Sequence, residues 1–546
     1  MADAAGPAIG SEVSELTPRR QLAALATVCV SLMVITIDVT ILNVALPTLA
    51  TELNADTSAL QWFVNAYELV FAGLLLTAGA LADRCGRRRI LATGLVVFGA
   101  ASAACAMSDS PSELIVGRVA MGLGGALVLP ATLSIVTNVF TEPTARARAI
   151  AVWAGVAALG LGLGPLVGGW LLQHFDWGSV FLVNVPVVIA AIAAGRLSIP
   201  ESRSPRAGRL DPVGAALSVA ALSSLLYAIT DGPGNGWSSP PTLAGFVVAA
   251  LAIVAFVAWE MRANEPMLDL GFFSDPRFSA AIAAIMALFF GLFALMFIST
   301  QALQSVMGYD PFAAGLRLVP LPALFLVFAQ VSVRVAGRVG TRLVVTAGLA
   351  IAAVGLATGA TLDAESGYGV LAVTLSLTGI GMGCTMAPAT ASIMGSVHRD
   401  RAAVAAAVND TARLTAGAIG VAVVGSLLSA AYSHALSGGA AATLPADAVA
   451  QAETSIASAA RVTEQAGGRT GEQILALATG GFIDGARTGL LVAAAVAQLG
   501  AVVAWRYLPP RVVATPPRRA GPTRRRDEAG DVSVSAVGRD HRPVSP

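Results

Sequence analysis

Charge is scarce in this sequence, and one common charged residue is missing altogether. Only 12% of the 546 residues are charged, and all 34 basic residues are arginines because the chain contains no lysine. A phosphate-binding loop of the Gly-x-x-x-x-Gly-Lys type cannot occur without lysine, which excludes ATP-driven work by this chain alone. The four histidines are dispersed and suggest neither a catalytic triad nor a metal cluster. We therefore predict that the protein is not an enzyme and holds no metal.

Cysteine is almost as rare. The four cysteines are Cys29, Cys85, Cys105 and Cys384. Their spacing is not that of metal ligands, and at least three of them fall in apolar segments. Neither a disulfide framework nor a zinc site is expected from this pattern.

Apolar residues, by contrast, dominate the chain. They make up 55% of the sequence, and the mean hydropathy is +0.73, which is typical of a protein that crosses a membrane many times. The first apolar run is too long for a signal-peptide core, so we expect it to be retained. We predict an all-α membrane protein with 14 transmembrane helices, at 22–47, 60–82, 89–107, 113–140, 146–172, 179–199, 211–231, 242–261, 278–306, 312–335, 342–362, 367–395, 402–432 and 482–508.

The spacing of these helices divides the chain into two sets of six with two extra helices between them. The predicted parts are a cytoplasmic N-terminus (1–21), an N-terminal six-helix bundle (22–199), a linker with helices 7 and 8 (200–277), a C-terminal six-helix bundle (278–508) and a disordered cytoplasmic tail (509–546). Residues 433–481 form an external loop, in which 446–460 is either an amphipathic helix or part of a flexible segment.

The arginines indicate the orientation. Almost all of those outside the spans fall on the side of the N-terminus, whereas only Arg461, Arg469 and Arg487 fall on the opposite side. Basic loops stay in the cytoplasm, so both termini are predicted to be cytoplasmic.

A single carboxylate, Asp38, lies inside the first apolar run. An ionisable group at membrane depth costs at least about 2.5 kcal/mol, so such a residue rarely persists without a function. We interpret Asp38 as a proton or substrate site. The alternative is a structural role, in which Asp38 caps a broken helix or pairs with a buried arginine.

Three further motifs stand out. Gly79 to Arg89 combines glycines that permit a tight turn with charged residues that make ionic contacts. The alternative is a basic loop that only sets the topology. The residues that carry the motif are Gly79, Asp83, Arg84, Gly86, Arg87 and Arg88. Arg118 lies about a turn inside the fourth span, where it must find an acid or carbonyls unless it reaches the outer interface. On the fifth span, small residues at intervals of four share one face and let another helix approach closely, and Pro165 is expected to bend the helix: Gly160, Gly164, Gly168 and, beside them, Gly169.

Together these motifs resemble the major facilitator superfamily, specifically its fourteen-helix drug/proton antiporter branch, over residues 22–508. The segment Asp38–Pro47, which includes Asn43, is similar to the helix-1 signature of that branch. The resemblance implies that Gly79 to Arg89 is a latch between the two halves, that Arg118 serves proton coupling, and that the glycines of span 5 form the antiporter motif of exporters. The second-half copy of the latch, Arg334–Arg342, has Gly337 in place of the aspartate, so a symmetric charge relay is not implied.

Other intramembrane charges lie outside these motifs. Glu68 occupies a position in span 2 that is usually uncharged in the family. It is either a site for cation selectivity or a second proton, or a partner for Arg118. Asp410 and Arg413 stand three residues apart on span 13, and we expect them to pair with each other.

We therefore predict proton-coupled efflux of a hydrophobic drug or antibiotic across the plasma membrane, with the proton gradient as energy source and no cofactor. The expected partners are a small hydrophobic or cationic substrate, protons and the lipid bilayer, without nucleic acid, and a monomer is expected. Two alternatives stay open. One is a dedicated exporter of a single self-made metabolite, and the other is a non-transporting membrane sensor built on a carrier scaffold.

Overall fold

The computed structural model describes residues 17–203, 211–263, 268, 270–397, 402–437, 445–466 and 468–510. These residues belong to one compact unit. Most of the predicted N-terminal segment 1–21 and nearly all of the predicted tail 509–546 lie outside the described residues.

Among the described residues every regular element is helical. The N-terminal helices, called here the first set, are α1 (Pro18–Glu52), α2 (Thr57–Cys85), α3 (Arg87–Ala106), α4 (Pro111–Val139), α5 (Pro143–His174), α6 (Ser179–Leu182) and α7 (Asn184–Ser198). Two helices follow, α8 (Pro212–Asn235) and α9 (Pro240–Glu260). The second set comprises η1 (Leu270–Ser274), α10 (Pro276–Gln301), η2 (Ala302–Val306), α11 (Pro311–Leu318), α12 (Pro320–Val339), α13 (Thr341–Gly359), α14 (Tyr368–Ser396), α15 (Ala402–Ser437), α16 (Ala446–Ala452), α17 (Ile456–Ala466) and α18 (Gly468–Tyr507).

Many of these helices begin at a side-chain cap. The carboxylate or hydroxyl accepts a hydrogen bond from a backbone N–H of the first turn, and in most of them a proline follows where no N–H is needed. The capping residues are Asp56, Ser110, Asp211, Ser239, Asp275 and Asp310.

Twelve helices of the described chain are long and apolar enough to cross a membrane. A thirteenth is added if α2, which bends by 56° between Leu75 and Thr77, counts as one span. The predicted number of 14 is therefore not confirmed.

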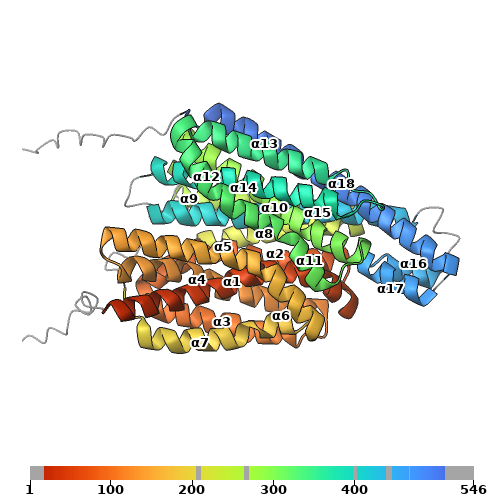
Figure 1. The fold of residues 1–546 in the computed structure, drawn as a ribbon, viewed down its shortest axis with the longest axis horizontal. Helices are drawn as coiled ribbons and strands as arrows, with labels where there is room; N and C mark the ends of the chain where they lie inside the picture. The colour runs from red at the N-terminus through yellow and green to blue at the C-terminus, as the bar shows by residue number, and fades with distance from the viewer. Residues whose placement is uncertain are drawn as a thin grey trace, which may run out of the picture. The chain divides into compact units, whose positions relative to one another are not determined.

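The helices pack mainly within their own set (Figure 1). In the first set α3 and α2 pack on α4, and α1 packs on α5. In the second set α14 packs on α12 and α13, while α18 packs on α10, α13 and α15. The two sets meet where α2 contacts α15 and where α5 contacts α11, and α8 covers α2 and α15 together.

Several boundaries differ from the prediction. The sixth span breaks at Val183, between α6 and α7, and the tenth breaks at Val319. Both residues keep right-handed helical angles, with φ and ψ of −58° and −27° at Val183 and of −56° and −33° at Val319. Pro320, which follows Val319, has no N–H to continue the ladder of backbone hydrogen bonds. The segment 446–460, which the sequence left open between an amphipathic helix and a flexible segment, contains α16 and the start of α17. Helix α18 begins at Gly468, well before the predicted start at 482.

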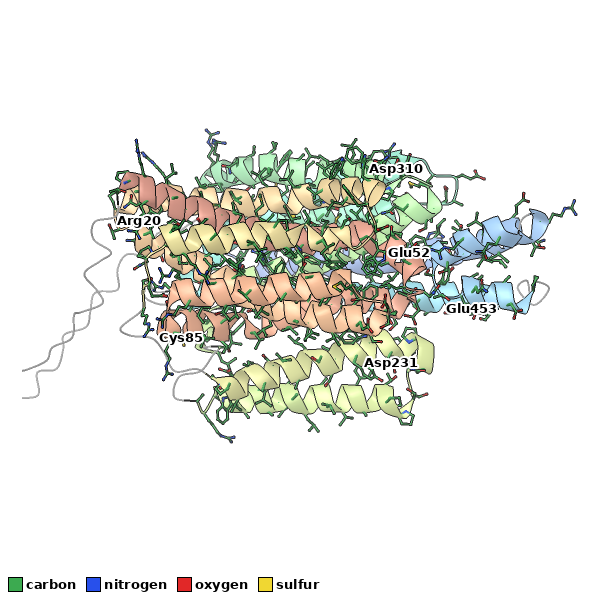
Figure 2. All side chains as sticks on the ribbon, turned by 90° about the horizontal axis from the view of Figure 1, so that it is seen from below. Arg20, Glu52, Cys85, Asp231, Asp310 and Glu453 are labelled. Carbon is green, nitrogen blue, oxygen red and sulfur yellow. The ribbon has the colours of Figure 1, made fainter. Side chains whose placement is uncertain are left out.

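The labelled residues in Figure 2 mark two ends of this unit. Arg20 and Cys85 lie toward one end, and Glu52, Asp231, Asp310 and Glu453 lie toward the other. Helices α1 and α2 therefore run in opposite directions, because Arg20 and Glu52 lie near the start and at the end of α1, and Cys85 ends α2.

Candidate functional site

Asp38 and Arg118 form an ion pair inside the first set. Arg118 Nη1 of α4 lies 2.7 Å from Asp38 Oδ2 of α1, and the two side chains are 1% and 0% exposed. A charge pair without access to water requires good geometry and further hydrogen bonds to offset desolvation. The structure brings together the two residues that the sequence singled out separately.

The other carboxylate oxygen of Asp38 is also bonded. Asn184 Nδ2, in the first turn of α7, donates to Asp38 Oδ1 at 3.2 Å and to Ser102 Oγ at 3.0 Å. Ser102 donates in turn to the Phe181 carbonyl at 2.8 Å, which the break at Val183 brings close. The sequence analysis missed Asn184 and Ser102. A buried asparagine in an apolar span was the available signal for the first.

Arg118 has a second anchor on α2. Its Nε donates to the Phe63 carbonyl at 2.9 Å, and its guanidinium lies 4.4 Å from the centre of the Tyr67 ring. Arg118 therefore keeps favourable contacts if Asp38 loses its charge. It is fully buried and does not reach the outer interface.

The glycine face of α5 packs on α1, the helix that carries Asp38. A Cβ at Gly160 would overlap the Thr36 hydroxyl, and one at Gly164 would overlap the Thr40 hydroxyl. At Gly168 a Cβ would lie 2.7 Å from Ile41 Cγ1. The predicted close approach of another helix is confirmed, and that helix is α1.

The opposite side of α5 reaches the second set. A Cβ at Gly169 would lie 2.5 Å from the Pro311 carbonyl oxygen, and one at Gly315 of α11 would overlap the Pro165 carbonyl. Helix α5 is thus held between α1 and α11. A movement of α1 can reach the second set through α5.

The side chains of the Gly79 to Arg89 segment form hydrogen bonds and ion pairs within the first set and with Glu201, just after α7. Asp83 accepts a 2.8 Å bond from Arg87, and Glu201 lies within 4 Å of Arg88 and Arg89. Gly86 has φ +114°, a conformation that favours glycine, and a Cβ there would lie 2.6 Å from Glu201. Among the described residues, no bond joins this predicted latch to the second set.

Contacts between the sets gather instead at the end marked by Glu52. Gln304 of η2 donates to the Val44 carbonyl at 2.7 Å, and Arg461 of α17 lies 3.6 Å from Glu52. A hollow of about 640 Å³ lies at the same end, lined by Asn54, Asp56, Ala59, Pro111, Ser433, Ala450, Glu453 and Thr454.

Glu68 does not pair with Arg118, although the sequence left that possibility open. Its carboxylate is 1% exposed, and neither oxygen has a hydrogen-bond partner among the described residues. It faces the second set, because a Cβ at Gly417 of α15 would lie 3.2 Å from Glu68 Oε2.

The remaining candidates have local partners. Arg413 Nη1 donates to Asp410 at 2.9 Å, so the predicted pairing within one helix is confirmed. Asn43 donates to the Val39 carbonyl of its own helix at 3.2 Å.

A buried ion pair, a glycine-packed helix and two sets of membrane-length helices together define the class of secondary transporters. Similarity to known proteins identifies the family. The family model of the Major Facilitator Superfamily matches residues 28–421. The chain belongs to this superfamily.

Its relatives include resistance proteins. It is 34% identical over 499 residues to the multidrug resistance protein Stp of Mycobacterium tuberculosis, covering 90% of this chain and 93% of that protein. It is also 34% identical to the tetracenomycin C resistance and export protein of Streptomyces glaucescens, over 74% of this chain and 75% of that one. Among solved structures, a bacterial homologue of the human lysosomal transporter Spinster shares the fold, with a TM-score of 0.66 and 17% identity over 90% of this chain and 98% of that one.

Proposed function

We propose that this chain exports hydrophobic, drug-like molecules across the plasma membrane and that inward proton flow drives the export. The names of its relatives, one for multidrug resistance and one for resistance to and export of tetracenomycin C, support the efflux of small molecules. The observation that carries the proton coupling is the Asp38–Arg118 pair. It is fully buried at 2.7 Å and joins α1 to α4 at membrane depth.

The topology belongs to the same proposal. Fourteen spans result if the bent α2 and the 32-residue helix α5 join the twelve helices that qualify by length and composition. They would form two six-helix bundles with α8 and α9 between them. The placement of most arginines on the Arg20 side supports a cytoplasmic location of both termini.

Protonation of Asp38 would work as a switch between helices. An ionised Asp38 attracts Arg118, whereas a neutral one does not, and Arg118 then keeps its contacts with Phe63 and Tyr67 of α2 and with Met121 of its own helix. The ionic contact between α1 and α4 is therefore weaker when Asp38 is neutral. Because α5 packs tightly on α1 and touches α11, the change is passed to the second set.

The arrangement supports one step of the cycle. The sets are joined at the Glu52 end, the predicted external side, while the Gly79 to Arg89 segment is bonded within its own half. Asp38 is paired in this arrangement, which suits entry of substrate from the cytoplasm. Opening to the outside then releases the substrate and lets Asp38 take up a proton. Coupling requires that proton and substrate bind the two arrangements with different affinities.

The contacts modify the role expected for Asp38. Its hydrogen-bond partners among the described residues, Arg118 and Asn184, both belong to the first set. We propose that Asp38 binds the coupled proton and affects substrate binding indirectly, through the packing of α1 on α5. Direct contact with the substrate then falls to other residues.

A dedicated exporter of one metabolite is the second candidate, because the tetracenomycin C exporter is as similar in sequence as the multidrug protein. Susceptibility of a deletion strain to a chemically diverse panel separates the two. A broad exporter gives hypersensitivity to several unrelated compounds, and a dedicated one gives it to a single class.

Transport in proteoliposomes tests the proposal. An imposed pH gradient should drive accumulation of at least one compound from a panel of cationic and neutral drugs, and a protonophore should abolish it. Asp38→Asn should reduce accumulation to the level of empty liposomes. The double variant Asp38→Asn/Arg118→Gln removes both charges, so it controls for instability caused by an unpaired buried arginine. Gradient-driven accumulation by either variant contradicts proton coupling through Asp38.

A further inference from the structure

Helix α2 carries a stripe of buried polar side chains toward the second set. Gln61, Asn65 and Glu68 recur at intervals of four and three residues, which places them on one helix face. All three are at most 1% exposed. The stripe lies where α2 meets α15, since a Cβ at Gly425 would lie 2.5 Å from Gln61 Cδ and one at Gly417 would lie 3.2 Å from Glu68 Oε2.

The polar atoms of this stripe are largely unpartnered. Among the described residues no hydrogen bond is made by Gln61 Nε2, by either amide atom of Asn65, or by either oxygen of Glu68. The one bond to the stripe comes from α8, where Thr230 donates to Gln61 Oε1 at 3.4 Å. A buried polar group without a partner costs about 1–3 kcal/mol, so a stripe of them is expected to serve a ligand.

The surroundings favour a positive charge. Arg118 is engaged with Asp38 and Arg413 with Asp410, and no ion pair of Glu68 exists within the described residues. Acceptor oxygens of Asn65 and Gln61 continue the stripe beyond the carboxylate. An intramembrane acid that forms no ion pair of its own points to a function, and a cationic ligand would supply the missing opposite charge.

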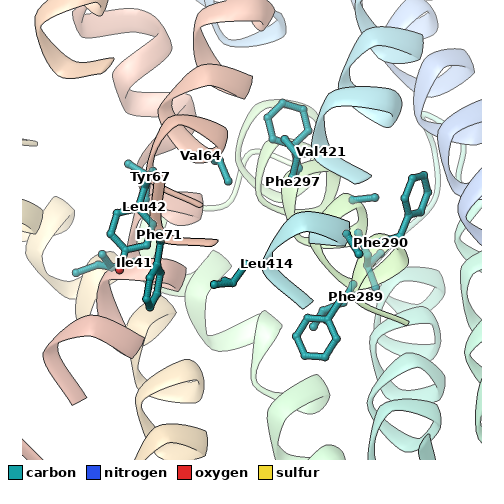
Figure 3. Close-up of a cluster of buried hydrophobic side chains, with 14 of the residues drawn as sticks. Ile41, Leu42, Val64, Tyr67, Phe71, Phe289, Phe290, Phe297, Leu414 and Val421 are labelled. Carbon is teal, nitrogen blue, oxygen red and sulfur yellow. The ribbon is translucent and has the colours of Figure 1, made fainter. Parts of the chain in front are cut away.

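Aromatic rings complete the site from the second set. The same Gly417 Cβ position that approaches Glu68 would lie 3.0 Å from Phe293 Cγ of α10. The neighbouring Phe289 ring already faces a cation, with the Arg413 guanidinium 5.0 Å from its centre. Figure 3 shows Val64, Tyr67 and Phe71 of α2 on one side and Leu414, Val421 and the α10 phenylalanines on the other. Carboxylate and aromatic faces together suit a lipophilic cation.

Among the described residues no side-chain hydrogen bond joins α15 to the stripe. Gly425 and Gly417 of α15 lie against Gln61 and Glu68, so the helices approach closely there. Separation of α15 from α2 would expose the stripe without breaking a side-chain hydrogen bond between the described residues of these two helices. A ligand that enters satisfies atoms that are unsatisfied when the helices touch.

We propose that Glu68, with Asn65 beside it and Phe293 opposite, forms the charge-recognition site for lipophilic organic cations. This inference rests on the proposed export function and assigns substrate recognition to the junction of α2, α10 and α15, apart from the proton site at Asp38. Helix α8 shields the same junction from lipid through Leu226 and its neighbours, which pack on Leu69 and Ala422.

Equilibrium binding of radiolabelled tetraphenylphosphonium to the purified full-length protein tests this site without any proton gradient. Glu68→Gln should weaken binding at least about tenfold at an unchanged melting temperature. Glu68→Asp should keep most of the affinity, and Glu365→Gln, which removes an exposed acid, should bind as the wild type does.

Each other result has a definite meaning. Absence of binding to the wild type, or binding by Glu68→Gln within about twofold of it, overturns the proposal. If Glu68→Gln also lowers the melting temperature, the aspartate variant decides: recovery of binding supports a charge site, and failure to recover it overturns one. Glu68-dependent binding without gradient-driven accumulation would contradict the proposed antiport and leave this site intact.

Discussion

At the scale of single residues, the properties of Asp38 depend on what surrounds it. Its carboxylate accepts from Arg118 on one oxygen and from Asn184 on the other, and Ser102 fixes Asn184 in turn. A fully bonded acid at membrane depth is stable only while its partners stay in place. The network therefore binds four helices, α1, α3, α4 and α7, to the protonation state of one group.

The role of Asn184 gives a prediction at this scale. Asn184→Ala removes the donor to Asp38 Oδ1 and should lower the free energy of unfolding by about 1–2 kcal/mol and impair transport. Thermal unfolding of the purified protein measures the first effect. Asn235→Ala is the matched control, because Asn235 is exposed and bonds only to Asp231 on the same helix, so it should change stability by less than about 0.5 kcal/mol. Equal stability of the two variants would show that the Asn184 bond is dispensable.

Asp38 and Arg118 can be identified as candidate site residues from the sequence alone, because an isolated charge in an apolar run is energetically costly to place in a membrane. The sequence does not reveal that they touch, since they are 80 residues apart and no local pattern joins them. Asn184, Asn65 and Gln61 escape such reasoning for another reason. A neutral amide is tolerated in a span, and only the packing shows that Asn184 bonds to Asp38 and that the Asn65 amide and Gln61 Nε2 are buried without partners among the described residues.

At the scale of elements, α5 has two functions that its sequence shows only in part. Its glycine repeat predicts a close neighbour, but the identity of that neighbour, α1, depends on the fold. The contact of Gly169 and Pro165 with α11 is not visible in the sequence at all. The breaks at Val183 and Val319 were likewise missed, because apolar periodicity continues across them.

Gly164 tests the junction of α5 and α1. In Gly164→Ala the new methyl group would overlap the Thr40 hydroxyl and lie 2.8 Å from the Ile37 carbonyl oxygen. We expect α5 to be displaced, with a loss of about 1–3 kcal/mol in stability and a severe loss of transport. Gly155→Ala on the same helix has open space around it and should behave as the wild type. Normal transport by Gly164→Ala would mean that close packing of α5 on α1 is not required.

At the scale of the whole molecule, the fold class is easier to predict from the sequence than the contacts of single residues are. The all-helical membrane fold follows from the apolar runs, because the bilayer constrains the length of each span so strongly. The division into two helix sets with an intervening pair and the cytoplasmic termini stay predictions, which rest on the spacing of those runs and on the arginines. The conformation of the carrier does not follow, since it depends on contacts such as Gln304 with Val44 that join residues 260 positions apart.

A native thiol tests the orientation. Cys85 is exposed at the end that also holds Arg20, whereas Cys29 and Cys105 are buried. A membrane-impermeant maleimide should label Cys85 in inside-out vesicles and not in intact cells, and Cys85→Ser should remove that labelling. Labelling of Cys85 from outside intact cells would reverse the proposed topology.

Proton movement in exchange for substrate is the most direct measurement of the mechanism. Proteoliposomes that enclose a pH indicator are given an outward substrate gradient without any imposed pH gradient. Because antiport exchanges each substrate that leaves the lumen for protons that enter it, we predict that the wild type acidifies the lumen in step with substrate efflux and that Asp38→Asn moves no protons. Substrate-driven proton flux of equal size in Asp38→Asn would contradict the assignment of the coupled proton to Asp38.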